Sequence, residues 1–196
     1  MRLVLAAMAI VIGTSSAAQA APAKKAVAHR APAKTAWASM IVATPEGGVR
    51  IGNPNAKVKL VEFGSRTCPH CAHFDADGLP ALRTGYIATG QVSYEFRDFP
   101  IHGALDLGPI LLGHCVPTRA FFPLLNAMMA NQEKLVGRPD QVPADKQQQL
   151  QGAKPTEIAA YLSKFYGYTD LVVQKGMPLA KATACLADTK AADLVA

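Results

Sequence analysis

Two segments in the first half of the chain have the hydrophobic pattern of β-strands. Residues 58–63 are mostly apolar, and residues 92–96 alternate between apolar and polar side chains, which gives the second strand one apolar face. A third, shorter strand is expected at residues 49–51, between turn-forming clusters at residues 44–48 and 52–55. The pattern therefore predicts a small sheet between residues 49 and 96.

The spacing of apolar residues is helical between the two longer strands and again after Pro100. A helix should begin near Cys68, with Pro69 in its first turn, and run towards Tyr86 with a bend at Pro80. Further helices are expected at residues 105–115, 119–130 (capped by Thr118), 157–166 (capped by Thr156), 171–174 and 178–187, whereas residues 137–153 are expected to form a loop. Strand, helix, strand and then a block of helices predict an α/β domain with a helical insertion.

The first twenty residues have the order of a secretory signal peptide. Arg2 is followed by an unbroken apolar run over residues 3–12, and Ala18-Gln19-Ala20 forms a cleavage site. The apolar run is short for a membrane span, although an uncleaved anchor is the alternative. We therefore expect a periplasmic protein that is not inserted in the membrane after cleavage.

Residues 21–36 are rich in alanine, proline and lysine and have few side chains that could enter a core. This composition is typical of a flexible, solvated tail, with a polyanion-binding arm as the alternative. The expected organisation is thus a signal peptide at 1–20, a tail at 21–36 and a folded domain at 37–196.

Composition and charge narrow the classes of function. Half of the 196 residues are apolar and 17% are charged, which excludes a wholly disordered chain. The formal charge is +6, but residues 1–45 hold five basic residues and no acidic one. The remainder is close to neutral, so the folded domain gives no indication of nucleic-acid binding.

The candidate chemistry lies in the tetrapeptide Cys68-Pro69-His70-Cys71. Two cysteines three residues apart on a helix lie on one face, close enough to form a disulfide. Cys68 is expected at the helix N-terminus, where free N–H groups and the nearby His70 favour a thiolate, so Cys68 would be the nucleophile and Cys71 the resolving thiol. The alternative is a zinc site, which needs four ligands. No second C-x-x-C pair exists in the sequence. The other possible ligands are His73, His102 and His114, and their spacing matches no recognisable metal-binding motif. We therefore predict a redox pair, with no metal and no cofactor.

Residues 58–74 read VKLVEFGSRTCPHCAHF. This stretch resembles the DsbA family of periplasmic thiol–disulfide oxidoreductases, within the thioredoxin-like superfamily, and the similarity extends over about residues 48–115. The resemblance implies a thioredoxin-like fold with a helical insertion, a nucleophile at Cys68 and a buried cysteine at Cys71. It also implies that exported proteins in a reduced or unfolded state are the substrates, and that a membrane partner reoxidises the protein. A disulfide isomerase, a reductase and a non-catalytic remnant of the fold are the alternatives.

The family's buried acid, which assists proton transfer to the inner thiol, falls on Glu62. Within Leu60–Phe63, a strand expected to be buried, Glu62 is the one charged residue. A buried carboxyl group usually has a function, whereas alternation alone allows this side chain to point into solvent.

The C-terminal part of the sequence departs from the family's pattern. Members of the family continue into a strand with a cis-proline that faces the C-x-x-C, followed by a hairpin and a last helix. The last proline here is Pro178, and it opens a helix. We therefore expect a thioredoxin-like domain that lacks the cis-proline strand, the hairpin and the last helix.

The two remaining cysteines are Cys115 and Cys185. If Cys68 pairs with Cys71, these two could form a structural disulfide, since free thiols are less stable in an oxidising compartment. The alternative is that each is a separate small core residue.

Overall fold

The computed structural model describes residues 37–136 and 142–195, so the expected signal peptide and tail lie outside the described residues. Four strands form one sheet in the order β1-β2-β4-β3. Their bounds are Ile41–Ala43 for β1, Val49–Gly52 for β2, Val58–Gly64 for β3 and Val92–Asp98 for β4. Strands β3 and β4 are parallel, and the other two pairs are antiparallel. The sequence predicted β2, β3 and β4 but not β1, which is three residues long and pairs with β2.

The two longer strands differ in burial in a way that the sequence did not predict. Strand β4 lies between β2 and β3, so its polar residues Ser93 and Glu95 are buried along with its apolar ones. Strand β3 is an edge strand of the described sheet, and Val58 and Phe63 are 56% and 62% exposed. The expectation that this strand is buried was wrong, because burial depends on the order of strands in the sheet and not on the apolar pattern alone.

The helix predicted from Cys68 towards Tyr86 is present and alternates between two geometries. It comprises α1 (Pro69–His73), a π-helical turn (Phe74–Gly78), α2 (Leu79–Leu82) and a second π-helical turn (Arg83–Ile87). Pro69 is the first residue of α1, where its missing N–H has no partner to lose. The first π-helical turn ends just before Pro80, which has no backbone N–H to donate to the preceding turn.

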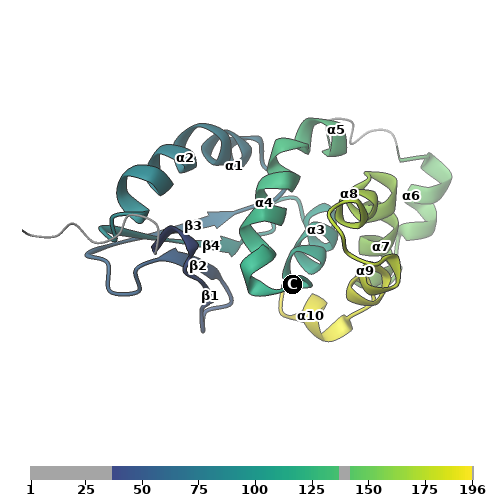
Figure 1. The fold of residues 1–196 in the computed structure, drawn as a ribbon. Helices are drawn as coiled ribbons and strands as arrows, with labels where there is room; N and C mark the ends of the chain where they lie inside the picture. Colours follow the sequence, from purple (N-terminus) through teal and green to yellow (C-terminus); the bar gives the residue numbers. More distant parts are fainter. Residues whose placement is uncertain (1–36, 137–141, 196) are drawn as a thin grey trace, which may run out of the picture. The chain divides into compact units, whose positions relative to one another are not determined.

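A core forms where this helix and α4 cover one face of the sheet (Figure 1). It contains Val49 and Ile51 of β2, Tyr94 and Phe96 of β4, Leu79 and Ile87 of the helix, and Phe121, Phe122, Leu125 and Met129 of α4. Apolar residues from four elements that are distant in sequence thus fix the position of α1 over the sheet.

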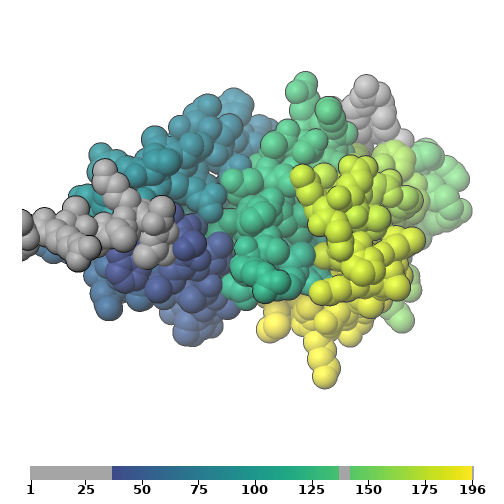
Figure 2. All heavy atoms as spheres, in the orientation of Figure 1, coloured from purple at the N-terminus to yellow at the C-terminus, as the bar shows by residue number. Residues whose placement is uncertain are grey.

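The second half of the chain is helical. The helices are α3 (Ala104–His114), α4 (Phe121–Ala130), α5 (Gln132–Val136), α6 (Ala144–Leu150), α7 (Pro155–Phe165), α8 (Tyr168–Gln174), α9 (Leu179–Leu186) and α10 (Thr189–Asp193). On the face seen in Figure 2, the green atoms of α4 lie between the blue atoms of the sheet region and the yellow-green atoms of α8 and α9. A second core is formed by apolar residues of α3, α4, α7, α8, α9 and α10.

The helical half corrects three predictions. Residues 137–153 were expected to be a loop, but Ala144–Leu150 forms α6, and residues 137–141 lie outside the described part. Helix α10 was not expected. Thr118 and Thr156 do not cap helices: residues 118–120 form a 3-10 turn, and Thr156 lies inside α7. The α/β class with a helical insertion is confirmed.

Candidate active site

The two cysteines of the tetrapeptide lie where β3 leads into α1. Cys68 occupies the N-cap position with an extended backbone, and Cys71 lies one turn further along, packed against the core beneath α1. Both are free and partly buried, and their thiols contact each other. His70, between them in sequence, is exposed. The structure therefore brings Cys68 and Cys71 together in the arrangement that a reversible disulfide requires.

Cys71 is strongly biased towards its protonated form. Burial raises the pKa of the Cys71 thiol to about 11, and the neighbouring thiol of Cys68 and the carboxyl group of Glu62 act in the same direction. A hydrogen bond with the backbone of Ser65 opposes this shift. Cys71 therefore stays a neutral thiol at physiological pH unless another group accepts its proton.

Glu62 faces inwards from the edge strand β3 and contacts the Cys71 thiol. Tyr94 donates a hydrogen bond from its hydroxyl to Oε2 of Glu62 over 2.5 Å, and Glu62 also shares a hydrogen bond with the Cys71 thiol. Burial raises the pKa of Glu62, and the charge of Asp75 adds to this, while the two hydrogen bonds lower it. The net pKa of this carboxyl group is above its ordinary value, so it is suited to exchange a proton with Cys71.

The three residues before Cys68 are anchored by their side chains. Ser65, Arg66 and Thr67 are all buried, although each is polar. Ser65 and Thr67 donate hydrogen bonds from their hydroxyls to Oδ1 of Asp106 over 2.7 and 2.6 Å, and the backbone N–H of His102 donates to Oδ2 over 2.7 Å. The Asp106 side chain is fully buried at the start of α3, so α3 holds the loop that presents Cys68.

Arg66 is anchored separately. Its guanidinium is fully buried and forms a two-point ion pair with Asp98, at 2.6 Å from Nε to Oδ1 and 3.0 Å from Nη2 to Oδ2. It also stacks over the ring of Phe121 at 4.9 Å. Burial alone would raise the pKa of Asp98, but Arg66 and a hydrogen bond from His114 outweigh it, so this pKa lies below its ordinary value.

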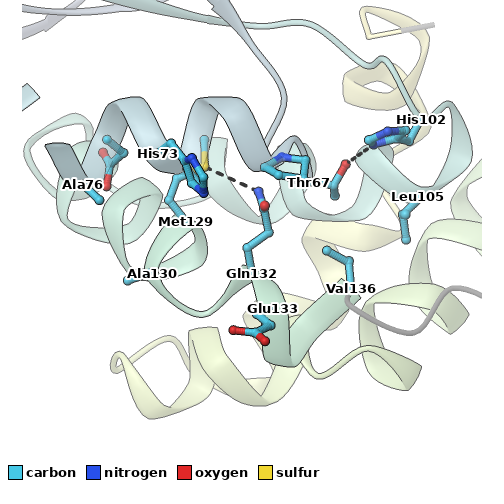
Figure 3. Close-up of a pocket in the computed structure, with 13 residues that line it drawn as sticks. Thr67, His73, Ala76, His102, Leu105, Met129, Ala130, Gln132, Glu133 and Val136 are labelled. Atoms are coloured by element: carbon cyan, nitrogen blue, oxygen red, sulfur yellow. Dashed lines mark hydrogen bonds between the residues drawn. The ribbon is translucent and has the colours of Figure 1, made fainter. Parts of the chain in front are cut away.

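A groove with a volume of about 770 Å³ lies beside the loop that ends at Cys68. Figure 3 shows the side chains that line it. Thr67 and Pro69, the neighbours of Cys68 in sequence, line it together with apolar residues of α1, α4 and α5. Gln132 projects into this region from α5 and donates from Nε2 to the backbone oxygens of Arg66 and Cys68, over 3.1 and 3.0 Å. The groove can therefore receive a polypeptide next to Cys68.

The histidines weighed as metal ligands are dispersed. His73 and His102 both line the groove, where Nδ1 of His102 lies 2.6 Å from Oγ1 of Thr67, and His114 pairs with Asp98. In the described part of the chain, no three His, Cys, Asp or Glu side chains are grouped so that they could hold a metal ion.

Cys115 and Cys185 are brought together as a disulfide, with their Cα atoms 6.2 Å apart and a sequence separation of 70. Cys115 ends α3, and Cys185 lies in α9. This pair is remote from the redox tetrapeptide in sequence and links the first helix of the insertion to one of its last.

Several site residues escaped the sequence analysis. Tyr94 was assigned only to an apolar strand face, and its hydroxyl contact depends on the parallel register of β3 and β4. Asp106 carries a usable signal, since it is an acid in an otherwise apolar helix. Gln132 has no comparable signal, because its role is to bind two backbone carbonyls more than 60 residues away in sequence.

Comparison with known proteins places the chain in a family. A family model described as thioredoxin matches residues 44–196. A Rickettsia conorii protein provisionally named a protein-disulfide oxidoreductase is 36% identical over 85 residues, which cover 43% of this chain and 30% of that protein. Disulfide bond formation protein D of Bacillus subtilis is 36% identical over 53 residues, which cover 27% of this chain and 24% of that protein. The chain thus spans less than a third of the length of these relatives in the matched regions.

Solved structures agree with the fold. The crystal structure of a protein-disulfide isomerase from Novosphingobium aromaticivorans has a TM-score of 0.70 and 29% sequence identity, covering 75% of this chain and 74% of that one. Wolbachia pipientis alpha-DsbA1 has a TM-score of 0.55 and 20% identity, covering 74% and 62%, which shows the fold alone. Since the family model covers most of the chain, this chain belongs to the thioredoxin family, as its resemblance to DsbA proteins implied.

Proposed function

We propose that this chain is a thiol–disulfide oxidoreductase that forms disulfides in other proteins through Cys68 and Cys71. The observation that carries the proposal is the pair itself: two free, partly buried thiols in contact, one at the N-cap of α1 and one a turn further along the helix. The names of the Rickettsia and Bacillus relatives support the same class of reaction.

The reaction would proceed in two exchanges. A substrate thiolate attacks Sγ of Cys68 in the oxidised protein, a mixed disulfide forms, and Cys71 leaves as a thiolate. The second substrate thiolate then attacks the substrate sulfur of the mixed disulfide and releases Cys68 as a thiolate. Two electrons pass from the substrate to the protein, so the substrate gains a disulfide and the protein becomes a dithiol.

Cys71 needs a proton when it leaves. Its thiol has a pKa of about 11, so its thiolate is a strong base in the reduced protein. Glu62 contacts it and has a raised pKa, which makes this carboxyl group the proton donor in the first exchange and the acceptor in the reverse reaction. Glu62 would thus accelerate exchange without taking part in any covalent bond.

The cellular setting is part of the proposal. The predicted signal peptide at residues 1–20 would export the chain to the periplasm, where reduced or unfolded exported proteins would be its substrates. No helix in residues 37–136 and 142–195 is long and apolar enough to cross a membrane. Because each turnover leaves the protein reduced, a membrane partner would have to remove the two electrons.

An isomerase is the second candidate, and the name of the Novosphingobium aromaticivorans structure favours it. An oxidase donates a disulfide and an isomerase rearranges existing ones, so two forms of one substrate separate them. Oxidised protein should restore activity to reduced ribonuclease, whereas an isomerase in its reduced form should restore activity to ribonuclease with scrambled disulfides.

We expect the oxidised wild-type chain to reactivate reduced ribonuclease and the Cys68→Ser variant to be inactive. Activity only with the scrambled form would reassign the chain as an isomerase. No reactivation of either form would leave the non-catalytic remnant as the correct description.

A further inference from the structure

We propose that Tyr94 is a positioning residue for this reaction: its hydroxyl holds the Glu62 carboxyl group beside the Cys71 thiol. The role rests on the exchange chemistry proposed for Cys68 and Cys71, and it assigns a function to a residue outside the tetrapeptide.

The strand register brings the two side chains to one face. Tyr94 of β4 pairs with Leu60 of β3, so Glu62 lies two residues further along β3 and projects on the same side of the sheet. From there Tyr94 reaches Oε2 of Glu62 with an oxygen–oxygen distance of 2.5 Å. Such a short distance is typical of a hydroxyl that donates to a charged carboxylate.

The hydroxyl is fixed by the packing of its ring. Tyr94 is 1% exposed, and its ring centroid lies 6.2 Å from that of Phe74 and 5.8 Å from that of Phe122. Glu62, in contrast, extends from an edge strand whose neighbouring residues Val61 and Phe63 are exposed. A flexible carboxyl group on such an edge would be free to turn towards solvent, and the rigid Tyr94 donor retains it beneath α1.

The other charged and titratable groups around Glu62 do not provide this donor. Asp75, in the π-helical turn above it, repels its charge, and Arg83 acts on Asp75. Cys71 of α1 is the proton partner itself. Of the groups that contact Glu62, Tyr94 does most to stabilise the charged carboxylate, which burial disfavours.

The test is the Tyr94→Phe variant, which removes the hydroxyl and keeps the ring. The full oxidised chain is mixed with reduced glutathione, and the rate of reduction of the Cys68–Cys71 disulfide is followed from pH 4 to pH 9. Without the hydroxyl, the Glu62 carboxyl group should turn towards solvent and lose the burial that raises its pKa, so the limb of the profile that depends on Glu62 should move to lower pH by about half to one unit. A carbon-13 NMR titration of the Glu62 carboxyl group should show a shift in the same direction.

The controls separate a positioning role from a structural one. Tyr168→Phe is the matched change, because Tyr168 is also fully buried and its hydroxyl has no hydrogen-bond partner among the described residues. It should leave the profile in place. In a Glu62→Gln background, Tyr94→Phe should cause no further shift, since the group it acts on is gone.

Two failures are distinguishable. If wild-type protein does not exchange with glutathione, the proposed function is overturned, and this role for Tyr94 with it. If wild-type protein exchanges and Tyr94→Phe has the same pH profile and the same Glu62 titration, the role of Tyr94 alone is overturned. A uniform loss of rate at every pH would likewise show that Tyr94 acts only through stability.

Discussion

Cys68 and Cys71 are three residues apart, yet their surroundings give them different chemistry. Cys68 ends the anchored loop, and its sequence neighbours Thr67 and Pro69 line the groove. Cys71, inside α1, contacts Glu62 and packs against the core. A thiol reacts as its thiolate, and the thiolate form of Cys71 is disfavoured by burial. This difference is the basis for proposing Cys68 as the nucleophile and Cys71 as the resolving thiol.

We predict that limiting iodoacetamide labels Cys68 before Cys71 in the reduced protein. With a pKa of about 11, Cys71 should react on the order of a hundredfold more slowly at pH 7 than a free cysteine. Peptide mapping by mass spectrometry gives the two rates. Equal rates, or faster labelling of Cys71, would contradict the assignment.

A second residue-scale prediction concerns Glu62. Its pKa is raised in the folded protein, so the charged carboxylate destabilises the folded state. This loss of stability is fully present above the pKa of Glu62 in the folded protein, and it disappears as the pH falls below the ordinary pKa of a glutamate. Glu62→Gln should therefore raise Tm at pH 7 by a few degrees at most. The gain should vanish near pH 4.

Thermal unfolding at the two pH values measures this effect, with the exposed Glu133→Gln as the control. A Tm gain that is the same at pH 4 and pH 7 would show that the carboxyl charge is not its source.

At the scale of elements, the loop before Cys68 is held from three directions. Helix α3 contributes Asp106, β4 contributes Asp98, and α5 contributes Gln132. Each contact is a hydrogen bond or ion pair to a buried group, which is costly to leave unpaired. The position of Cys68 therefore depends on elements that are far from it in sequence.

Asp106→Asn should destabilise the protein by about 1–3 kcal/mol, because an amide keeps the shape but replaces one acceptor oxygen with a donor group. Urea unfolding measures the loss, and the exposed Asp77→Asn on the first π-helical turn serves as the control. If both variants unfold at the same urea concentration as the wild-type protein, the anchoring of the loop by Asp106 is not significant for stability.

For the whole molecule, the Cys115–Cys185 disulfide closes the helical block. A loop of 70 residues corresponds to a stabilisation of about 4 kcal/mol in the chain-entropy model. Replacing both cysteines with alanine should lower the free energy of unfolding by up to that amount. Peptide mapping of protein alkylated without reduction should recover a linked pair, and recovery of both cysteines in alkylated form would reject the bond.

Local patterns were sufficient to predict the strands β3 and β4, the start of α1 at Pro69 and the contact between Cys68 and Cys71. The exposure of β3 was not predictable, because it depends on which strands flank it. Helix α6 was missed because Pro143 and Gly152 border it, and a segment with such residues resembles a loop. In the site, Cys68 and Cys71 lie within one tetrapeptide, but Tyr94 and Asp106 join the site only through hydrogen bonds to residues more than 30 positions away, Glu62 and Thr67.

The central claim is that Cys68 and Cys71 exchange a disulfide with other proteins. The most direct measurement is a single turnover between the oxidised chain and an equimolar peptide with two cysteines, quenched with an alkylating agent and analysed by mass spectrometry. Our account predicts one peptide disulfide formed for each Cys68–Cys71 pair that becomes alkylated, and none with the Cys68→Ser variant. A peptide that stays reduced, or one that is oxidised equally well by Cys68→Ser, would contradict it.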